Sequence, residues 1–229
     1  MTNMDMQNLN RATMNYLIHN IKAGMFLKEV RELCETYMLK NGADSFWYWD
    51  IGAFVFSGDE TTVSVSGRQY ETSNRIIDEN DIITVDLSPQ NNNIWGDYAR
   101  TIVIQHGKPV DKIEDIENNE WRSGLQMELF LHQKLMEIAE PDMTFEELYY
   151  KINNIISDKG FVNLDFMGNL GHSIVKDKNN RIYTEKGNKN KLSNVEFFTF
   201  EPHISIPNSA FGYKREDIYY FKNGKLMKL

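Results

Sequence analysis

The chain has 229 residues, 33 acidic and 25 basic side chains, and a formal net charge of −8. This length suits a single α/β domain with a substantial core. The acidic balance argues against nucleic acid or an anionic membrane as the main partner, because both favour a basic protein face. No stretch approaches the roughly 20 apolar residues that span a bilayer, so we expect one domain over residues 1–229.

The first ten residues, MTNMDMQNLN, are polar. They show no positively charged region followed by an apolar run, as a signal peptide would. Cys34 is the one cysteine, so an intramolecular disulfide is excluded, and its place on the apolar stripe of a predicted helix indicates a buried thiol. We therefore expect a soluble cytoplasmic protein, with its state as monomer or homodimer left open.

Two helices are predicted first in chain order, at about 5–20 and within 21–44. In the second, apolar residues recur at three- and four-residue steps, which is the stripe of an amphipathic helix, and Gly42 fits its stop. Four runs typical of strands follow: WYWDIGAFVF, TTVSVS, DIITVDLS and GDYARTIVI.

The same order then returns. A helix is predicted at about 118–138, and a second amphipathic helix follows, in which Thr144 and Glu147 fit a capping box and Gly160 fits the stop. Four more strand-like runs come after it: FVNLDF, GHSIV, FFTFEPHI and DIYYF. Residues 176–193 are polar, basic and rich in Gly and Asn, so we expect them to form an exposed excursion.

Five side chains of metal-binding type lie in or beside these strand-like runs: Asp86, Asp97, His172, Glu201 and Glu216. Asp and Glu are depleted in strands and rarely buried without a partner, yet Asp86 follows IITV and Glu201 follows FFTF. A bound cation would compensate such buried carboxylates. Four carboxylates and one imidazole suit two divalent ions of Mn, Co, Fe or Zn.

These segments resemble the methionine aminopeptidase, aminopeptidase P, prolidase and creatinase superfamily over roughly residues 5 to 222. The resemblance rests on DIITVDLSP with GDYARTIVI, and on GHSI, FTFEPHI and REDIYYF, in that order. It implies the pita-bread fold, an α+β fold with a curved, mainly antiparallel sheet and helices outside. The two helix pairs alone leave a true repeat and chance similarity equally open. The family's pseudo-twofold build favours related halves at about 5–110 and 118–222.

The resemblance also implies roles for the five ligands. Asp86 would chelate one ion, Asp97 and Glu216 would bridge both ions, and His172 with Glu201 would complete the second site. A water or hydroxide held between two cations is a nucleophile at neutral pH, and the cations polarise the attacked carbonyl. Glu201 would additionally move the proton from this water to the leaving amine.

The peptidases of this superfamily carry histidines at two positions where this chain has other residues. The first corresponds to Asn179, seven residues after His172, and the second to Val65, seven residues after Gly58. His203, two residues after Glu201, is the candidate replacement, because alternate residues of a regular strand share a side. A structural role for His203 is the open alternative.

The substrate side of the pocket is predicted more coarsely. Arg68 and Tyr70 follow the loop that lacks histidine and are candidates for binding a substrate carboxylate. Trp49, in the aromatic run at 46–49, is a candidate for an apolar subsite, although such runs more often belong to a core. Arg100 is expected to brace the site by pairing with a carboxylate.

Three functions fit this sequence. The first is a dinuclear metallohydrolase, an aminopeptidase or Xaa-Pro-type peptidase with an altered pocket. The second is a hydrolase of a small non-peptide C–N bond, as creatinase is, which the missing histidines favour. The third is a non-catalytic binding module, against which all five ligands argue. We expect the enzyme, with a peptide or small amide as substrate.

Overall fold

The computed structural model describes all 229 residues. Its helices are α1 (Asn3–Asn20), α2 (Leu27–Lys40), α3 (Asn119–Ile138) and α4 (Phe145–Asp158). The strands of the first half are β1 (Ser45–Phe46), β2 (Ala53–Ser57), β3 (Asp81–Leu87), β4 (Pro89–Asn91), β5 (Ile94–Trp95), β6 (Tyr98–Gln105) and β7 (Lys108–Pro109). Those of the second are β8 (Val162–Asn163), β9 (Ser173–Ile174), β10 (Phe197–Phe200), β11 (His203–Ser205), β12 (Gly212–Lys214), β13 (Asp217–Lys222) and β14 (Lys225–Lys228).

The four predicted helices form, and their ends follow from local chemistry. The Thr144 side chain accepts a hydrogen bond from the Glu147 amide at 3.1 Å, and the Glu147 carboxylate accepts one from the Thr144 amide at 2.8 Å, which is the predicted capping box. Gly42 (φ +126°) and Gly160 (φ +79°) follow α2 and α4 in a conformation that favours glycine. None of the helices combines the length and apolar character of a membrane span.

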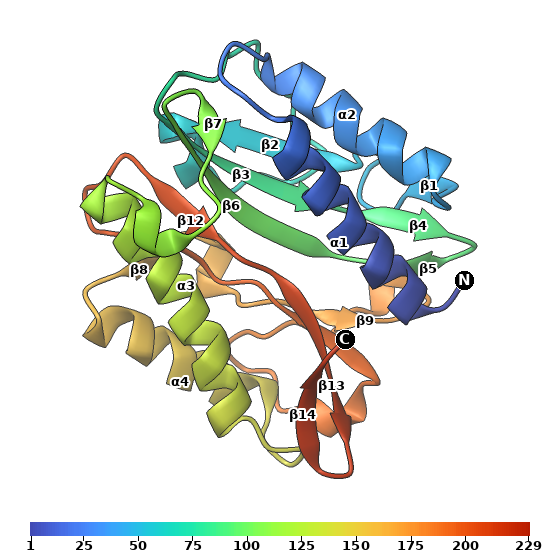
Figure 1. Cartoon of the computed structure of the whole chain (residues 1–229). Helices are drawn as coiled ribbons and strands as arrows, with labels where there is room; N and C mark the ends of the chain where they lie inside the picture. Colours follow the sequence, from blue (N-terminus) through green and yellow to red (C-terminus); the bar gives the residue numbers. More distant parts are fainter.

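The strands form four small sheets in which every pair is antiparallel. Their orders are β2-β3-β6-β7, β14-β13-β10-β9, β12-β11-β8 and β1-β4-β5. In Figure 1, α1 and α2 lie over the strands of the first half, and α3 and α4 flank those of the second half. The predicted α+β architecture with mainly antiparallel strands and external helices is confirmed.

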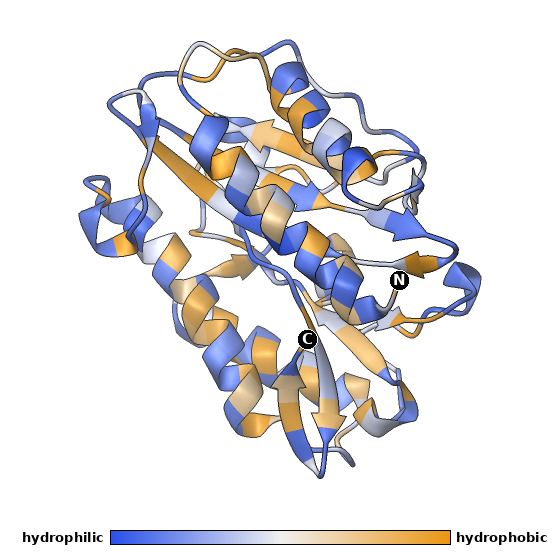
Figure 2. Cartoon of the chain, turned by 45° about the vertical axis from the view of Figure 1, so that its right-hand side comes forward, coloured by the Kyte–Doolittle hydropathy of each residue, from blue (hydrophilic) through white to orange (hydrophobic).

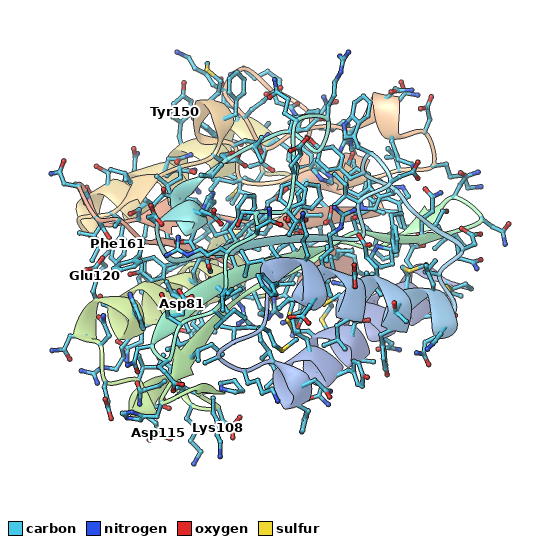
Figure 3. All side chains as sticks on the ribbon, turned by 90° about the horizontal axis from the view of Figure 1, so that it is seen from above. Asp81, Lys108, Asp115, Glu120, Tyr150 and Phe161 are labelled. Carbon is cyan, nitrogen blue, oxygen red and sulfur yellow. The ribbon has the colours of Figure 1, made fainter.

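Each half packs its own core beneath its helices. One cluster of 19 buried residues joins α1 and α2 to β2, β3 and β6, and a second of 21 joins α3 and α4 mainly to β10, β11 and β13. Figure 2 shows apolar and polar residues alternating around the helices, as amphipathic helices require. Side chains fill the space between the halves in Figure 3, with Tyr150 on the outside of α4.

Two predicted strands differ from the structure. The run TTVSVS begins in a 3-10 helix, Gly58–Thr62, and continues as a loop that lines the central cavity. The run FFTFEPHI is broken after Phe200, because Pro202 has no backbone N–H to donate to a ladder. The chain therefore leaves the sheet of β10 and enters the sheet of β11 at His203, so strand alternation does not place Glu201 and His203.

The capping box gives a prediction about stability. Thr144→Ala removes the side-chain acceptor for the Glu147 amide at the start of α4 and is expected to lower the free energy of unfolding by about 1 kcal/mol. Ser157→Ala, at an exposed position near the end of α4, is the matched control and should change it little. Urea unfolding of both variants makes the comparison, and equal losses would contradict a role for the cap.

Candidate metal centre

The first two predicted ligands are placed by the β3–β6 hairpin. Asp86 is the penultimate residue of β3 and pairs across the ladder with Ala99 of β6. Asp97 immediately precedes β6, and its carbonyl accepts a hydrogen bond from the Gln7 side chain of α1 at 3.0 Å. The hairpin thus directs both carboxylates to one place, and α1 holds the backbone of the second.

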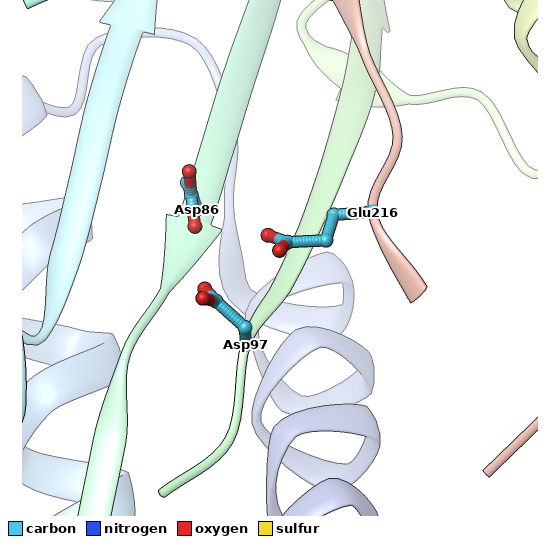
Figure 4. A group of neighbouring side chains, drawn as sticks. All are labelled: Asp86, Asp97 and Glu216. Carbon is cyan, nitrogen blue, oxygen red and sulfur yellow. The ribbon is translucent and has the colours of Figure 1, made fainter. Parts of the chain in front are cut away.

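The third carboxylate comes from the other half of the chain. Glu216 lies between β12 and β13, and its amide donates to the Ala99 carbonyl at 3.0 Å. One ligand atom from each of Asp86, Asp97 and Glu216 lies within 4.8 Å of the others. Figure 4 shows the three carboxylates converging from separate strand ends. This contact between halves therefore assembles a cluster that no single segment contains.

Burial makes this cluster electrostatically unfavourable as it stands. Burial and then the Asp86 charge raise the pKa of Asp97 well above its usual value. Burial, followed by Asp97, Glu201 and Asp86, raises the pKa of Glu216 in the same way. Both oxygens of Glu216 lack a hydrogen-bond partner. Carboxyl groups held in this way either take up a proton or, when ionised, need a compensating positive charge.

His172 adds a nitrogen donor, and a glycine determines where it lies. Gly171 has φ +132°, and a Cβ there would collide with the Thr199 carbonyl. The Nδ1 of His172 lies 3.2 Å from the Ser173 carbonyl, while Nε2 lies 3.4 Å from Asp97 and 3.7 Å from Glu201. Burial lowers the pKa of this imidazole. A neutral ring that donates from Nδ1 leaves the Nε2 lone pair facing the carboxylates, as a metal ligand needs.

Glu201 and Lys214 close the cluster. The Nζ of Lys214 lies 2.6 Å from Asp86 Oδ2 and 3.3 Å from Glu201 Oε2. Although burial opposes it, the charges of Asp86 and Glu201 raise the pKa of Lys214 well above its usual value. One ammonium therefore faces four carboxylates, and most of the negative charge stays uncompensated within the chain.

The donors fit divalent cations. Carboxylate oxygens and one imidazole nitrogen suit hard or borderline metals, and the unpartnered oxygens of Glu216 are free to coordinate. The structure brings all five predicted ligands together. Their individual roles, chelating or bridging, remain predictions.

Four of the five predicted ligands line a cavity of about 670 Å³, and Glu216 lies buried behind its wall. Ser64, Val65 and Ser66 line it where the related peptidases carry a histidine, and Asn179 is exposed and outside the lining. His203 does line the cavity. Its Nε2 donates to the Thr61 carbonyl at 2.7 Å, and burial followed by Lys214 lowers its pKa to about 4. His203 is thus a neutral ring with one nitrogen already engaged.

The three candidate substrate residues lie outside the lining of this cavity. Arg68 is exposed and stacks on Trp49, with the guanidinium carbon 5.9 Å from the ring centroid. The Tyr70 hydroxyl accepts from the Val55 amide at 2.8 Å. Trp49 is itself 57% exposed. Their roles in substrate binding remain predictions.

Arg100 pairs with a carboxylate, as the sequence predicted. Its Nη2 lies 2.8 Å from Asp217 Oδ1, and its Nη1 donates to the Glu216 carbonyl at 2.7 Å. Burial would raise the pKa of Asp217, but Arg100, followed by the buried His132 imidazole, Lys228 and Arg215, lowers it to about 2. This network fixes the backbone on both sides of Glu216.

Two cations that the sequence did not predict, Lys214 and Arg181, line the cavity. The signal for Lys214 was its position two residues before Glu216 in an extended segment, where alternate side chains share a side. Arg181 gave no signal, because it lies in the polar excursion whose path only the folded chain defines.

The profile of metallopeptidase family M24 matches residues 5–223. The chain is 26% identical over 200 residues to an Xaa-Pro dipeptidase of Pyrococcus furiosus, covering 87% of this chain and 52% of the relative. It is 28% identical over 141 residues to an Xaa-Pro dipeptidase of Lactobacillus delbrueckii subsp. lactis, covering 62% and 35%. The chain thus spans about half the length, or less, of these relatives.

Solved structures share the fold. The prolidase from Pyrococcus furiosus superposes with a TM-score of 0.79 at 22% identity, covering 98% of this chain and 61% of that one. The X-Pro aminopeptidase from Thermotoga maritima superposes with a TM-score of 0.77 at 22% identity, covering 99% and 58%. The match over nearly the whole sequence and this shared pita-bread fold lead to one conclusion: the chain belongs to metallopeptidase family M24.

Proposed function

We propose that this chain is a metal-dependent peptidase that releases an amino-terminal residue, of the aminopeptidase or Xaa-Pro type. The observation that carries the proposal is the convergence of Asp86, Asp97 and Glu216 within 4.8 Å beside His172 and Glu201, in a cavity large enough for a short peptide. The family membership and the Xaa-Pro dipeptidase relatives support it.

In this proposal the five predicted ligands would hold two divalent ions. Asp86 would serve one ion and His172 with Glu201 the other, and Asp97 and Glu216 would be shared. When bound, such ions supply an activated water and polarise the scissile carbonyl. These donors are compatible with Mn, Co, Fe or Zn as the physiological metal.

The remaining steps belong to the chain's own groups. Glu201 accepts the proton of the attacking water and passes it to the leaving amine, which is general acid–base catalysis. Lys214, 3.3 Å from Glu201, stabilises the charged form of that carboxylate. The Thr199 hydroxyl donates to Glu201 at 3.3 Å and accepts from the His172 amide at 2.9 Å, so it holds both ligands in register.

A second candidate function is hydrolysis of a small non-peptide C–N bond. It is favoured by Val65 in the cavity wall and by the exposed Asn179, which stand at the two positions where the related peptidases have histidines. A protein-binding module without catalysis has no evident use for these buried carboxylates.

Metal binding is the first prediction about function. Mn²⁺ at 100 times its Kd should stabilise the wild-type protein by about 2.7 kcal/mol, measured as a rise in Tm by calorimetry. Asp97→Asn removes a shared ligand and should abolish most of this rise. Asp111→Asn, at an exposed carboxylate outside the cavity lining, is the control. An undiminished rise in Asp97→Asn would overturn the ligand assignment.

Peptide cleavage is the second prediction. The Mn- or Co-loaded protein should release one amino-terminal residue from Met-Ala-Ser or Ala-Pro-Ala, followed as new free amine. Glu201→Gln should lower kcat by about 10²–10⁴ because it loses the proton shuttle, and metal content measured in parallel separates this loss from loss of metal. A fully metallated wild-type protein that cleaves neither peptide would contradict peptidase function and favour the second candidate.

His203 gives a third prediction. His203→Ala should lower kcat/KM by about tenfold or more while leaving metal content unchanged, if the imidazole takes part in catalysis. His203→Gln retains a donor for the Thr61 carbonyl and controls for a merely structural effect. Unchanged kinetics in both variants would assign His203 to anchoring the loop at Thr61.

A further inference from the structure

Two buried tryptophans lie where the two halves of the chain meet, and the proposed chemistry does not use them. Trp47 follows β1 and Trp95 ends β5, both in the first half, and they are 8% and 1% exposed. Their ring centroids are 4.4 Å apart. Each centroid also lies 5.7 Å from that of the His172 imidazole, which comes from the second half. The pair therefore forms part of the wall around a predicted ligand.

The indole N–H of each tryptophan is hydrogen-bonded to the backbone beside a predicted ligand. Trp95 Nε1 donates to the Val175 carbonyl at 2.7 Å, three residues after the ligand imidazole, and β5 and β9 lie next to each other in Figure 1. Trp47 Nε1 donates to the Gly96 carbonyl at 3.0 Å, directly before Asp97. Indole N–H groups in protein interiors are usually paired in this way. The two bonds therefore tie the ligand segments of both halves to one pair of rings.

The surroundings of the pair restrict its movement. The Trp47 amide donates to the Ser88 carbonyl at 3.0 Å. Gly96 packs directly against α1, where a Cβ would lie only 2.7 Å from Asn10 Nδ2. The two rings also belong to a small buried cluster that is separate from the cores of the two halves, with Ile174, Ile218 and Leu229. The pair is thus a rigid element at the junction between the halves.

This element determines how the ligand imidazole lies. The Nδ1 of His172 lies 3.2 Å from the Ser173 carbonyl, and its Nε2 lies 3.4 Å from Asp97. The Tyr183 ring, with its centroid at 5.9 Å, adds a third aromatic contact. A reversed imidazole would lose the Ser173 contact and turn Nδ1 toward Asp97. Close packing by three rings opposes that reversal, because interiors tolerate little free volume.

We propose that Trp47 and Trp95 act together as positioning residues for the metal centre. They hold Asp97 and His172, one ligand from each half, at the separation that a shared cation requires. The inference rests on the ligand assignment of the proposed function, and it does not require peptide cleavage. The pair acts through the ligand backbones and the imidazole face rather than by contacting an ion.

Conservative substitutions test the pair. Trp95→Phe keeps an aromatic ring and deletes the hydrogen bond to Val175, and calorimetric titration with Mn²⁺ should show affinity reduced about 10–100-fold. Trp47→Phe, which deletes the bond to Gly96, should behave in the same way. The double variant should lose less than the two single losses combined, because the residues act as one unit. The visible absorption spectrum of the Co²⁺-loaded protein should change in each variant, because it reports ligand geometry.

Trp121→Phe is the matched control. Trp121 lies in α3, is 8% exposed, and its Nε1 has no hydrogen-bond partner. The control should leave the Mn²⁺ affinity and the Co²⁺ spectrum unchanged, and urea unfolding of every variant separates metal affinity from global stability. Unchanged Mn²⁺ affinity in both Trp47→Phe and Trp95→Phe, or an equal loss in Trp121→Phe, would overturn the positioning role.

A measurement without metal separates this inference from the peptidase proposal. Long-range ¹H–¹⁵N NMR of the metal-free protein reports which nitrogen of His172 carries the proton. The wild-type protein and Trp121→Phe should show one form, protonated at Nδ1, and Trp95→Phe should show exchange between two ring orientations. That result supports the positioning role even if no peptide is cleaved, in which case only the peptidase proposal fails. An imidazole that is unchanged in both Trp47→Phe and Trp95→Phe refutes the role whatever the activity.

Discussion

The main physical constraint on this structure is a group of acidic side chains that are buried together where the two halves meet. Asp86 and Asp97 come from the first half, and His172, Glu201 and Glu216 come from the second. Burial and mutual repulsion raise the pKa of Asp97 and of Glu216, so bringing the halves together costs free energy at this point. Positive charge offsets that cost; Lys214 supplies it in part, and divalent cations would complete it.

The rest of the fold opposes this repulsion by fixing the ligand backbones rather than their side chains. The amide of Glu216 donates to Ala99 and its carbonyl accepts from Arg100, so β6 holds both sides of this ligand. On the face toward α3, the Nε2 of His132 lies 3.1 Å from the Arg215 carbonyl, and its Nδ1 lies 2.7 Å from the Tyr219 hydroxyl. Backbone contacts of this kind preorganise the side chains predicted to be ligands.

The wall opposite the ligands is built from loops, and there the sequence was less informative. The predicted strand TTVSVS is instead a 3-10 turn and a loop, since it pairs with no neighbouring strand. The break at Pro202 moves His203 into another sheet, yet His203 still lines the cavity because β11 lies beside the 3-10 turn and contacts Thr61. Strand alternation therefore pointed to a residue that does line the cavity, although the backbone between Glu201 and His203 is not a continuous strand.

The sequence by itself determined the helices, the strand that carries Asp86 and the strand that ends just before Glu201, and it predicted the five donors. These follow from local periodicity, capping residues and acidic side chains in apolar runs, all of which act over a few residues. Only the tertiary structure decided that Lys214 pairs with Asp86 across 128 positions, and that Arg181 rather than Arg68 lines the cavity. Long charged side chains have no periodic signature, and their partners are set by where distant loops meet.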